Sequence, residues 1–75
     1  MNFYVVAFVD YHNNKIEQVK VAANSKADAM RAVLHSCWKS SEYPDTKEYV
    51  DLLQTVEELE TAAFDGDCLI SAIEI

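Results

Sequence analysis

The feature that most constrains the fold is a segment near the N-terminus, residues 3–11 (FYVVAFVDY), which is rich in β-branched and aromatic residues. Successive side chains of a strand point to opposite faces of a sheet, so the segment divides into two alternating sets. Both sets are apolar: Phe3, Val5, Ala7 and Val9 form one, and Tyr4, Val6 and Phe8 form the other. The sequence therefore predicts a strand in the middle of a sheet or at a dimer interface.

The next residues predict a β-hairpin. Residues 12–15 (HNNK) tolerate the positive φ angles of a tight turn. Residues 16–22 then form the partner strand, in which Gln18 and Lys20 make one face polar. A strand with one polar face is typical of a sheet edge.

A first helix is predicted after Asn24 or Ser25, since either side chain can cap it. Apolar residues recur at the spacing of a buried helical stripe, and polar residues at the spacing of a solvent face. The stripe comprises Ala27, Met30, Val33, Leu34, Cys37 and Trp38, and the solvent face comprises Asp28, Arg31, His35 and Lys39. Residues 40–44 (SSEYP) end this helix, because the residue before proline avoids helical angles.

A second helix is predicted directly after Pro44, with Asp45 or Thr46 as its N-cap. Asp45 and Glu48, three residues apart, resemble the two residues of a capping box. One sector of this helix is apolar (Tyr49, Leu52, Leu53, Val56 and Leu59) and an outer stripe is acidic (Glu48, Asp51 and Glu58, with Thr55). We expect the helix to end near Glu60. Residues 64–67 (FDGD) make a turn, and residues 68–75 (CLISAIEI) form a closing strand.

These elements predict one α+β domain spanning residues 1–75, in the order β-β-α-α-β. The sheet has three strands and is mainly antiparallel, with the first strand central and both helices on one face. One glycine and one proline are too few for the turns of a many-stranded sandwich or barrel. The second face of the sheet would then expose apolar side chains, so we expect a homodimer formed through the sheet.

The charge is divided unequally along the chain, whose net charge is −7. Residues 1–40 hold five basic and three acidic side chains, a net charge of +2, whereas residues 41–75 hold one basic and ten acidic, a net charge of −9. This imbalance argues against direct binding to nucleic acid and favours a basic protein partner, such as a nucleic-acid-binding effector complex. The alternative is a homo-oligomeric regulatory or structural subunit whose acidity serves only solubility.

The predicted partner-binding site lies within residues 42–60, where tyrosines alternate with carboxylates. Aromatic side chains supply rigid contact area, and negative charge steers a basic partner. Carboxylates every three or four residues along a helix are also spaced closely enough to imitate phosphates. The candidate residues are Glu42, Tyr43, Asp45, Glu48, Asp51 and Glu58.

Other combinations of residues indicate chemistry less well. His35 and Cys37 point about 200° apart on a helix, so they do not form a nucleophile pair. His12, His35, Cys37 and Cys68 lack the paired spacings of a zinc site, and 65–67 (DGD) lacks the later ligands of a calcium loop. Glu57, Glu58 and Glu60 are more typical of a solvated helix face than of paired catalytic carboxylates.

We therefore expect a protein that is not an enzyme and that uses no cofactor or metal. Cys37 and Cys68 are expected to be reduced and mostly buried thiols. The sequence contains no apolar run of membrane-spanning length, and its first ten residues lack the basic region of a signal peptide. The expected location is the cytoplasm.

Residues 16–34, in which V-K-V-A-A-N-S-K-A-D-A-M leads from strand through cap into helix, resemble a pattern in small phage and mobile-element proteins. Together with the small size, the acidity and the β-β-α start, this looks like the anti-CRISPR and other anti-defence inhibitors. The resemblance implies a cytoplasmic inhibitor that occludes a nucleic-acid-binding groove of a host protein. It assigns no role to individual residues.

Overall fold

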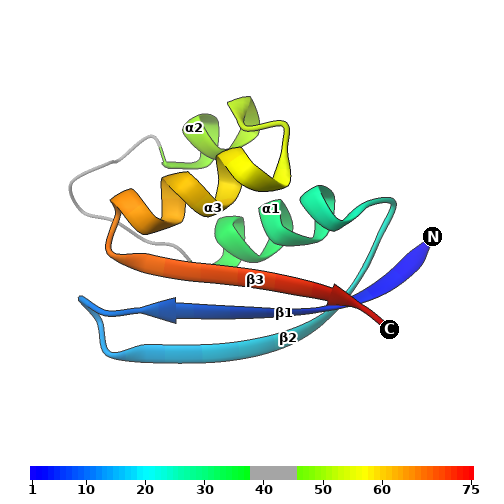
Figure 1. Cartoon of the computed structure of the whole chain (residues 1–75), viewed down its shortest axis with the longest axis horizontal. Coiled ribbons are helices and arrows are strands. Elements are labelled where there is room, and N and C mark those ends of the chain that lie inside the picture. The colour runs from blue at the N-terminus through cyan, green and yellow to red at the C-terminus, as the bar shows by residue number, and fades with distance from the viewer. Residues whose placement is uncertain (38–45) are drawn as a thin grey trace.

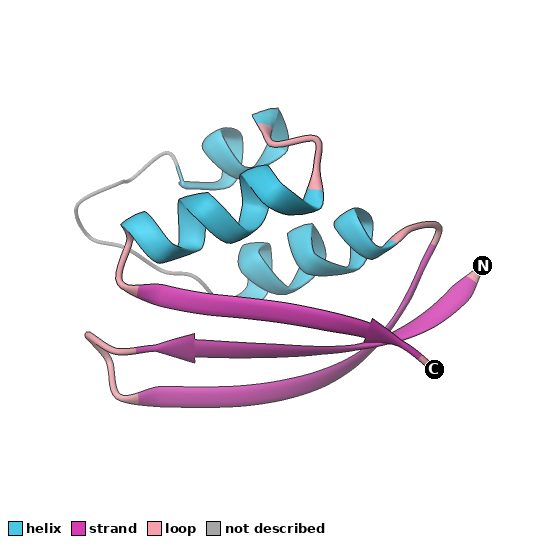
Figure 2. Cartoon of the chain, viewed as in Figure 1, coloured by secondary structure: helices cyan, strands magenta, loops and turns pink. Residues whose placement is uncertain are grey.

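The computed structural model describes residues 1–37 and 46–75. Within these residues, three strands and three helices follow one another, and Figure 2 shows their arrangement. Their bounds are β1 (Asn2–Asp10), β2 (Lys15–Ala23), α1 (Lys26–Cys37), α2 (Thr46–Leu52), α3 (Val56–Asp65) and β3 (Cys68–Glu74). The predicted α+β class and the succession of two strands, a helical region and a closing strand are confirmed.

The sheet has the order β2-β1-β3, and β1 pairs antiparallel with both neighbours. The doubly apolar strand is thus central, as predicted. Val6 in its middle lies opposite Val19 of β2 and Ala72 of β3. The hairpin between β1 and β2 turns through Asn14, whose φ of 57° lies in the left-handed region that asparagine tolerates.

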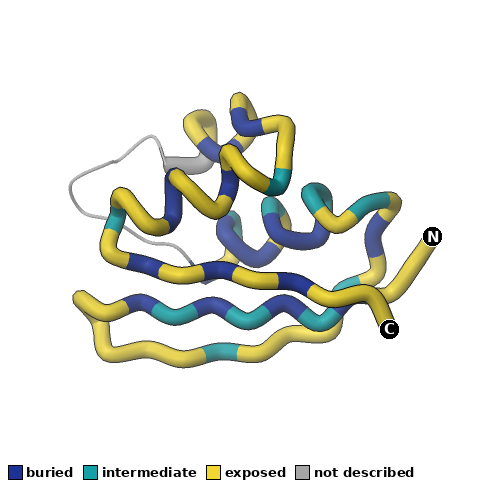
Figure 3. The backbone as a smooth tube through the Cα atoms, in the orientation of Figure 1, coloured by how far each residue is buried: buried dark blue, intermediate teal, exposed yellow. Residues whose placement is uncertain are grey.

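The helices lie on one side of the sheet (Figure 1). The alternate residues of β1 that face the helices are buried, and so are those of β3 (Figure 3). Helices α1 and α3 contact the sheet, whereas α2 packs chiefly against α1. The largest fully buried side chains are Phe8, Met30, Leu34, Leu59, Val6, Val50 and Cys68.

The single second helix predicted from Asp45 to about Glu60 is wrong in its continuity and its end. The chain leaves the helical path after Leu52 and starts α3 at Val56, with Thr55 as N-cap in extended conformation. The restart shifts the helical phase, so that Leu59, Ala62 and Ala63 form the buried face of α3. Glu60 is exposed and does not interrupt that face, and α3 continues to Asp65.

The predicted solvent face of α1 is partly covered, because α2 packs across it. Arg31 and His35 keep only 19% and 27% of their side-chain surface exposed. The cap left open between Asn24 and Ser25 is Ser25, whose Oγ accepts a hydrogen bond from the Asp28 N–H at 3.1 Å. Trp38 and Lys39, assigned to the two faces of this helix, lie outside the described residues.

Asp10 is a buried carboxylate at the end of β1. It accepts hydrogen bonds from the backbone N–H groups of His12 (3.1 Å) and Asn13 (3.3 Å) and from Nδ2 of Asn13 (2.7 Å). Burial alone would raise the pKa of Asp10, but the hydrogen bonds from Asn13, His12 and Cys68 outweigh it and lower the pKa. The ionised carboxylate therefore fixes the hairpin turn.

Candidate functional site

The acidic helical surface consists of the exposed carboxylates of residues 48–60, in α2 and the first half of α3. It comprises Glu48, Asp51, Glu57, Glu58 and Glu60. The sequence contains no lysine or arginine between positions 48 and 75, so no basic side chain of this stretch offsets these charges. The two helices that carry the surface lie on one side of the sheet, and both have exposed positions along their length (Figures 1 and 3).

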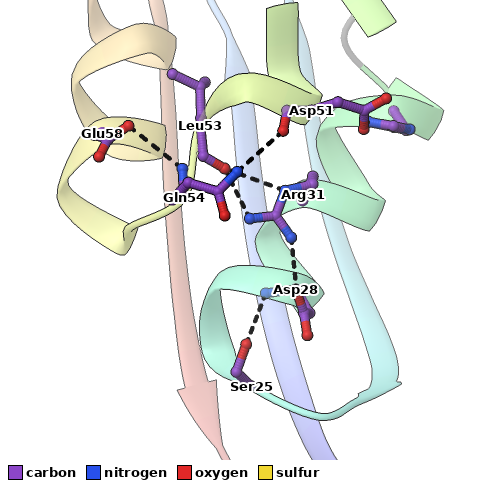
Figure 4. A network of polar contacts seen from close by, with 8 residues as sticks. Ser25, Asp28, Arg31, Asp51, Leu53, Gln54 and Glu58 are labelled. Carbon is purple, nitrogen blue, oxygen red and sulfur yellow. Dashed lines mark hydrogen bonds and ion pairs between the residues drawn. The ribbon is translucent and has the colours of Figure 1, made fainter. Parts of the chain in front are cut away.

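Arg31 of α1 fixes the place where α2 ends. Its Nε and Nη2 donate to the backbone carbonyl of Leu53 at 3.3 and 2.7 Å, and its Nη1 lies 2.6 Å from Oδ1 of Asp28 (Figure 4). The last carbonyls of a helix have no partner within the helix, and here a guanidinium supplies one. Arg31 thereby ties the junction between α2 and α3 to α1.

The start of α3 is a capping arrangement around Thr55 and Glu58. The Glu58 N–H donates to Oγ1 of Thr55 at 3.1 Å. Oε2 of Glu58 accepts from the N–H of Gln54 at 3.3 Å (Figure 4). In the usual capping box the glutamate bonds the N–H of the capping residue, whereas here it bonds the residue before it. Glu58 thus has a local structural role as well as a place on the surface.

Asp51 is the point at which the acidic helical surface approaches α1. Its Oδ1 lies 3.0 Å from Nε2 of His35. That nitrogen makes no hydrogen bond to any residue within 1–37 or 46–75, so the two side chains are close together without being hydrogen-bonded. Protonation of the imidazole would turn it into an ion pair between α1 and α2.

The structure places three of the six predicted partner-binding residues, Glu48, Asp51 and Glu58, and all three are exposed. They lie on two helices and not on one continuous helical stripe, because the helix is interrupted at residues 53–55. Glu42, Tyr43 and Asp45 lie outside the described residues.

Exposed apolar side chains accompany the carboxylates on α2 and α3. Tyr49, Leu52 and Phe64 are 49%, 73% and 68% exposed. Tyr49 and Leu52 belong to the predicted apolar sector, but both are exposed because α2 ends at Leu52; among residues 48–53, Val50 and Leu53 are the buried ones. Large apolar side chains between carboxylates are the residue types that protein interfaces use for contact area.

The two thiols are free and buried, as predicted. Cys37 donates a hydrogen bond to Glu17, and burial together with this carboxylate raises its pKa to about 11. The pKa of Cys68 is raised to about 11. Burial is the largest cause, and the negative charge and hydrogen bond of Asp10 and the negative charge of Asp67 add to it. Both groups stay protonated at neutral pH, which makes them poor nucleophiles and metal ligands.

The residues weighed for metal binding are kept apart. His35 approaches Asp51, Cys37 bonds Glu17, and Nε2 of exposed His12 lies 2.7 Å from Oδ2 of Asp67. Within residues 1–37 and 46–75, no three histidine, cysteine, aspartate or glutamate side chains form a group that could hold a metal ion. Asp65 ends α3 and Gly66 caps it, so the DGD sequence forms a helix-to-strand turn.

Comparison with family models, curated proteins and solved structures gives no match to this chain. Among the described helices, none has the length and apolar composition needed to cross a membrane. The surface chemistry of α2 and α3 is therefore the basis on which function is assigned.

Proposed function

We propose that the protein is a non-catalytic interaction protein that binds a basic protein through the acidic helical surface. The observation that carries the proposal is that the five carboxylates of the acidic helical surface lie on the same two helices as exposed Tyr49, Leu52 and Phe64. Carboxylates steer a basic partner and set its orientation, while the apolar side chains supply contact area once it has arrived.

The partner class that fits is a nucleic-acid-binding protein of the host cytoplasm. A groove that binds phosphates presents arginine and lysine, and carboxylates held on two short helices offer it negative charges at similar spacing. In this proposal the protein is a phage or mobile-element inhibitor of the anti-CRISPR kind, which occupies such a groove. Rigid placement of the charges by Arg31 and the Thr55 cap supports it, since a preorganised surface loses less entropy on binding.

The test uses a fluorescent arginine-rich peptide as the basic probe and measures its affinity by anisotropy. The double variant Glu48→Lys/Glu57→Lys changes one exposed residue on each helix and leaves the Glu58 cap intact. The control Asp65→Lys/Glu74→Lys changes two exposed residues at the ends of α3 and β3. Both variants have a net charge of −3, because each substitution adds two charges to −7.

The proposal predicts that the Glu48→Lys/Glu57→Lys variant loses at least tenfold in affinity and that the control loses less than threefold. Equal losses in the two variants would mean that net charge alone attracts the probe, and would refute a specific surface. Binding should also weaken as salt shortens the Debye length from about 10 Å at 0.1 M, and a single-stranded oligonucleotide should compete for the probe.

A further inference from the structure

The face of the sheet that lies opposite the helices is uncovered by the described residues (Figure 1). Residues that pair across antiparallel strands share a face, so the register defines this surface. The open sheet face comprises Phe3, Val5, Ala7 and Val9 of β1, Ile16, Gln18, Lys20 and Ala22 of β2, and Leu69, Ser71 and Ile73 of β3.

The open sheet face is mostly apolar, with small and polar side chains in its middle. Val9 lies between Ile16 and Leu69 in one row, and Val5 lies between Lys20 and Ile73 in another. Ile16, Leu69 and Ile73 are 79%, 43% and 60% exposed. Between these rows, Ala7 lies between Gln18 and Ser71. The Val9 row and the Val5 row thus flank a shallow central row that can donate and accept hydrogen bonds.

The charge of this face sets it apart from the rest of the molecule. No carboxylate among the described residues lies on it, although the chain has a net charge of −7. Its one ionisable side chain is Lys20, whose Nζ lies 5.1 Å from the ring centroid of Phe3. Two copies that met through the acidic helical surface would oppose five carboxylates with five carboxylates, whereas two copies that met through this face would each bring one charge, that of Lys20.

The size of the face fits a dimer contact. Strands of nine, nine and seven residues, at ~3.3 Å per residue and ~4.8 Å between strands, give about 400 Å² in projection. Protruding side chains make the accessible area larger than the projection. A specific interface needs roughly 500 to 800 Å² per partner, so the open sheet face is of the required order.

We propose that the open sheet face is the contact between two copies of this chain, packed sheet against sheet. Facing sheets lie about 10 Å apart, and a two-fold contact centred on β1 sets the Ala7 row of one copy against the Ala7 row of the other. Both acidic helical surfaces then point outward from the dimer. This inference does not depend on the proposed function.

The test is sedimentation equilibrium of the full chain and of three variants at micromolar to submillimolar concentration. Ala7→Lys sets two lysines against each other at the centre of the contact, and Ile73→Lys puts a second positive charge into the row that holds Lys20. Both side chains lie on the open sheet face, outside the core, so circular dichroism and cooperative unfolding should stay unchanged. Leu52→Lys is the control, since it adds the same charge at an exposed apolar position of α2.

The proposal predicts a mass of twice 8.5 kDa for the wild type and for Leu52→Lys, and folded monomers for Ala7→Lys and Ile73→Lys. A wild-type mass of one chain across the whole range would overturn it. So would a dimer that survives both face variants, or one that Leu52→Lys dissociates. Binding of the wild-type monomer to zwitterionic lipid vesicles would also overturn it, by assigning the face to a membrane surface.

Discussion

Replacing Arg31 by methionine tests whether one side chain positions the acidic helical surface. The guanidinium makes two hydrogen bonds to the Leu53 carbonyl and an ion pair with Asp28. A hydrogen bond that involves a charged group contributes about 1.5–3 kcal/mol, and an i,i+3 ion pair on a helix adds less than ~0.5 kcal/mol. Methionine keeps the apolar stem but leaves the carbonyl unpaired, so Arg31→Met should lower the free energy of unfolding by about 2–3 kcal/mol.

The assay is chemical and thermal unfolding followed by circular dichroism. For a domain of this size, 1 kcal/mol corresponds to roughly 4–8 °C in Tm, which gives an expected fall of about 8–24 °C. Arg31→Lys should restore part of the loss, because an ammonium group cannot reproduce the planar fork of donors. Lys26→Met, at an exposed position of the same helix, should change stability by less than ~0.5 kcal/mol. A value for Arg31→Met as small as that of Lys26→Met would refute the positioning role.

Three further predictions concern the buried titratable groups. The pKa of Asp10 is lowered from 3.8 in the folded state, so the ionised carboxylate stabilises the fold above pH 3.8 and this stabilisation is lost on acidification. Asp10→Asn should lower the free energy of unfolding by about 1–3 kcal/mol at pH 7 and should make that free energy depend less on pH in acid. The pKa of the Cys68 thiol is raised from 9.0 to about 11 in the folded state. The free energy of unfolding should therefore fall by about 2–3 kcal/mol between pH 9 and 11, because the thiol ionises first in the unfolded chain. Unfolding of Cys68→Ala followed over the same pH range should not show this loss. Cys37→Ala should cost ~1–2 kcal/mol in urea unfolding and leave binding of the arginine-rich peptide unchanged, whereas full stability with lost binding would assign the thiol a functional role.

The strands were predictable because their signal is local. The two apolar faces of residues 3–11 require a central strand, and the polar alternation of residues 16–22 requires an edge, whatever else the chain does. The open sheet face follows from the same alternation. The pairing register of the strands could not be predicted from the sequence, and it is this register that places Ala7, Gln18 and Ser71 in one row.

The break in the second helical region was not predicted, although the sequence carries a signal for it. Residues 55–58 (TVEE) match the capping-box pattern directly before apolar Leu59. The competing helical periodicity from Tyr49 to Leu59 continues across the break and concealed it. The contact that sets the end of α2 joins Arg31 to a backbone carbonyl 22 residues later, and no spacing rule reports such a contact.

An NMR titration of isotope-labelled protein with the arginine-rich peptide tests most directly whether a basic partner binds through α2 and α3. We expect backbone amide shifts to change along residues 48–60, with the largest changes at Glu48, Glu57 and Glu60. Glu48→Lys/Glu57→Lys should abolish these changes, and Asp65→Lys/Glu74→Lys should retain them. Shift changes confined to the sheet strands or to the β1–β2 turn would contradict binding of a basic partner through α2 and α3.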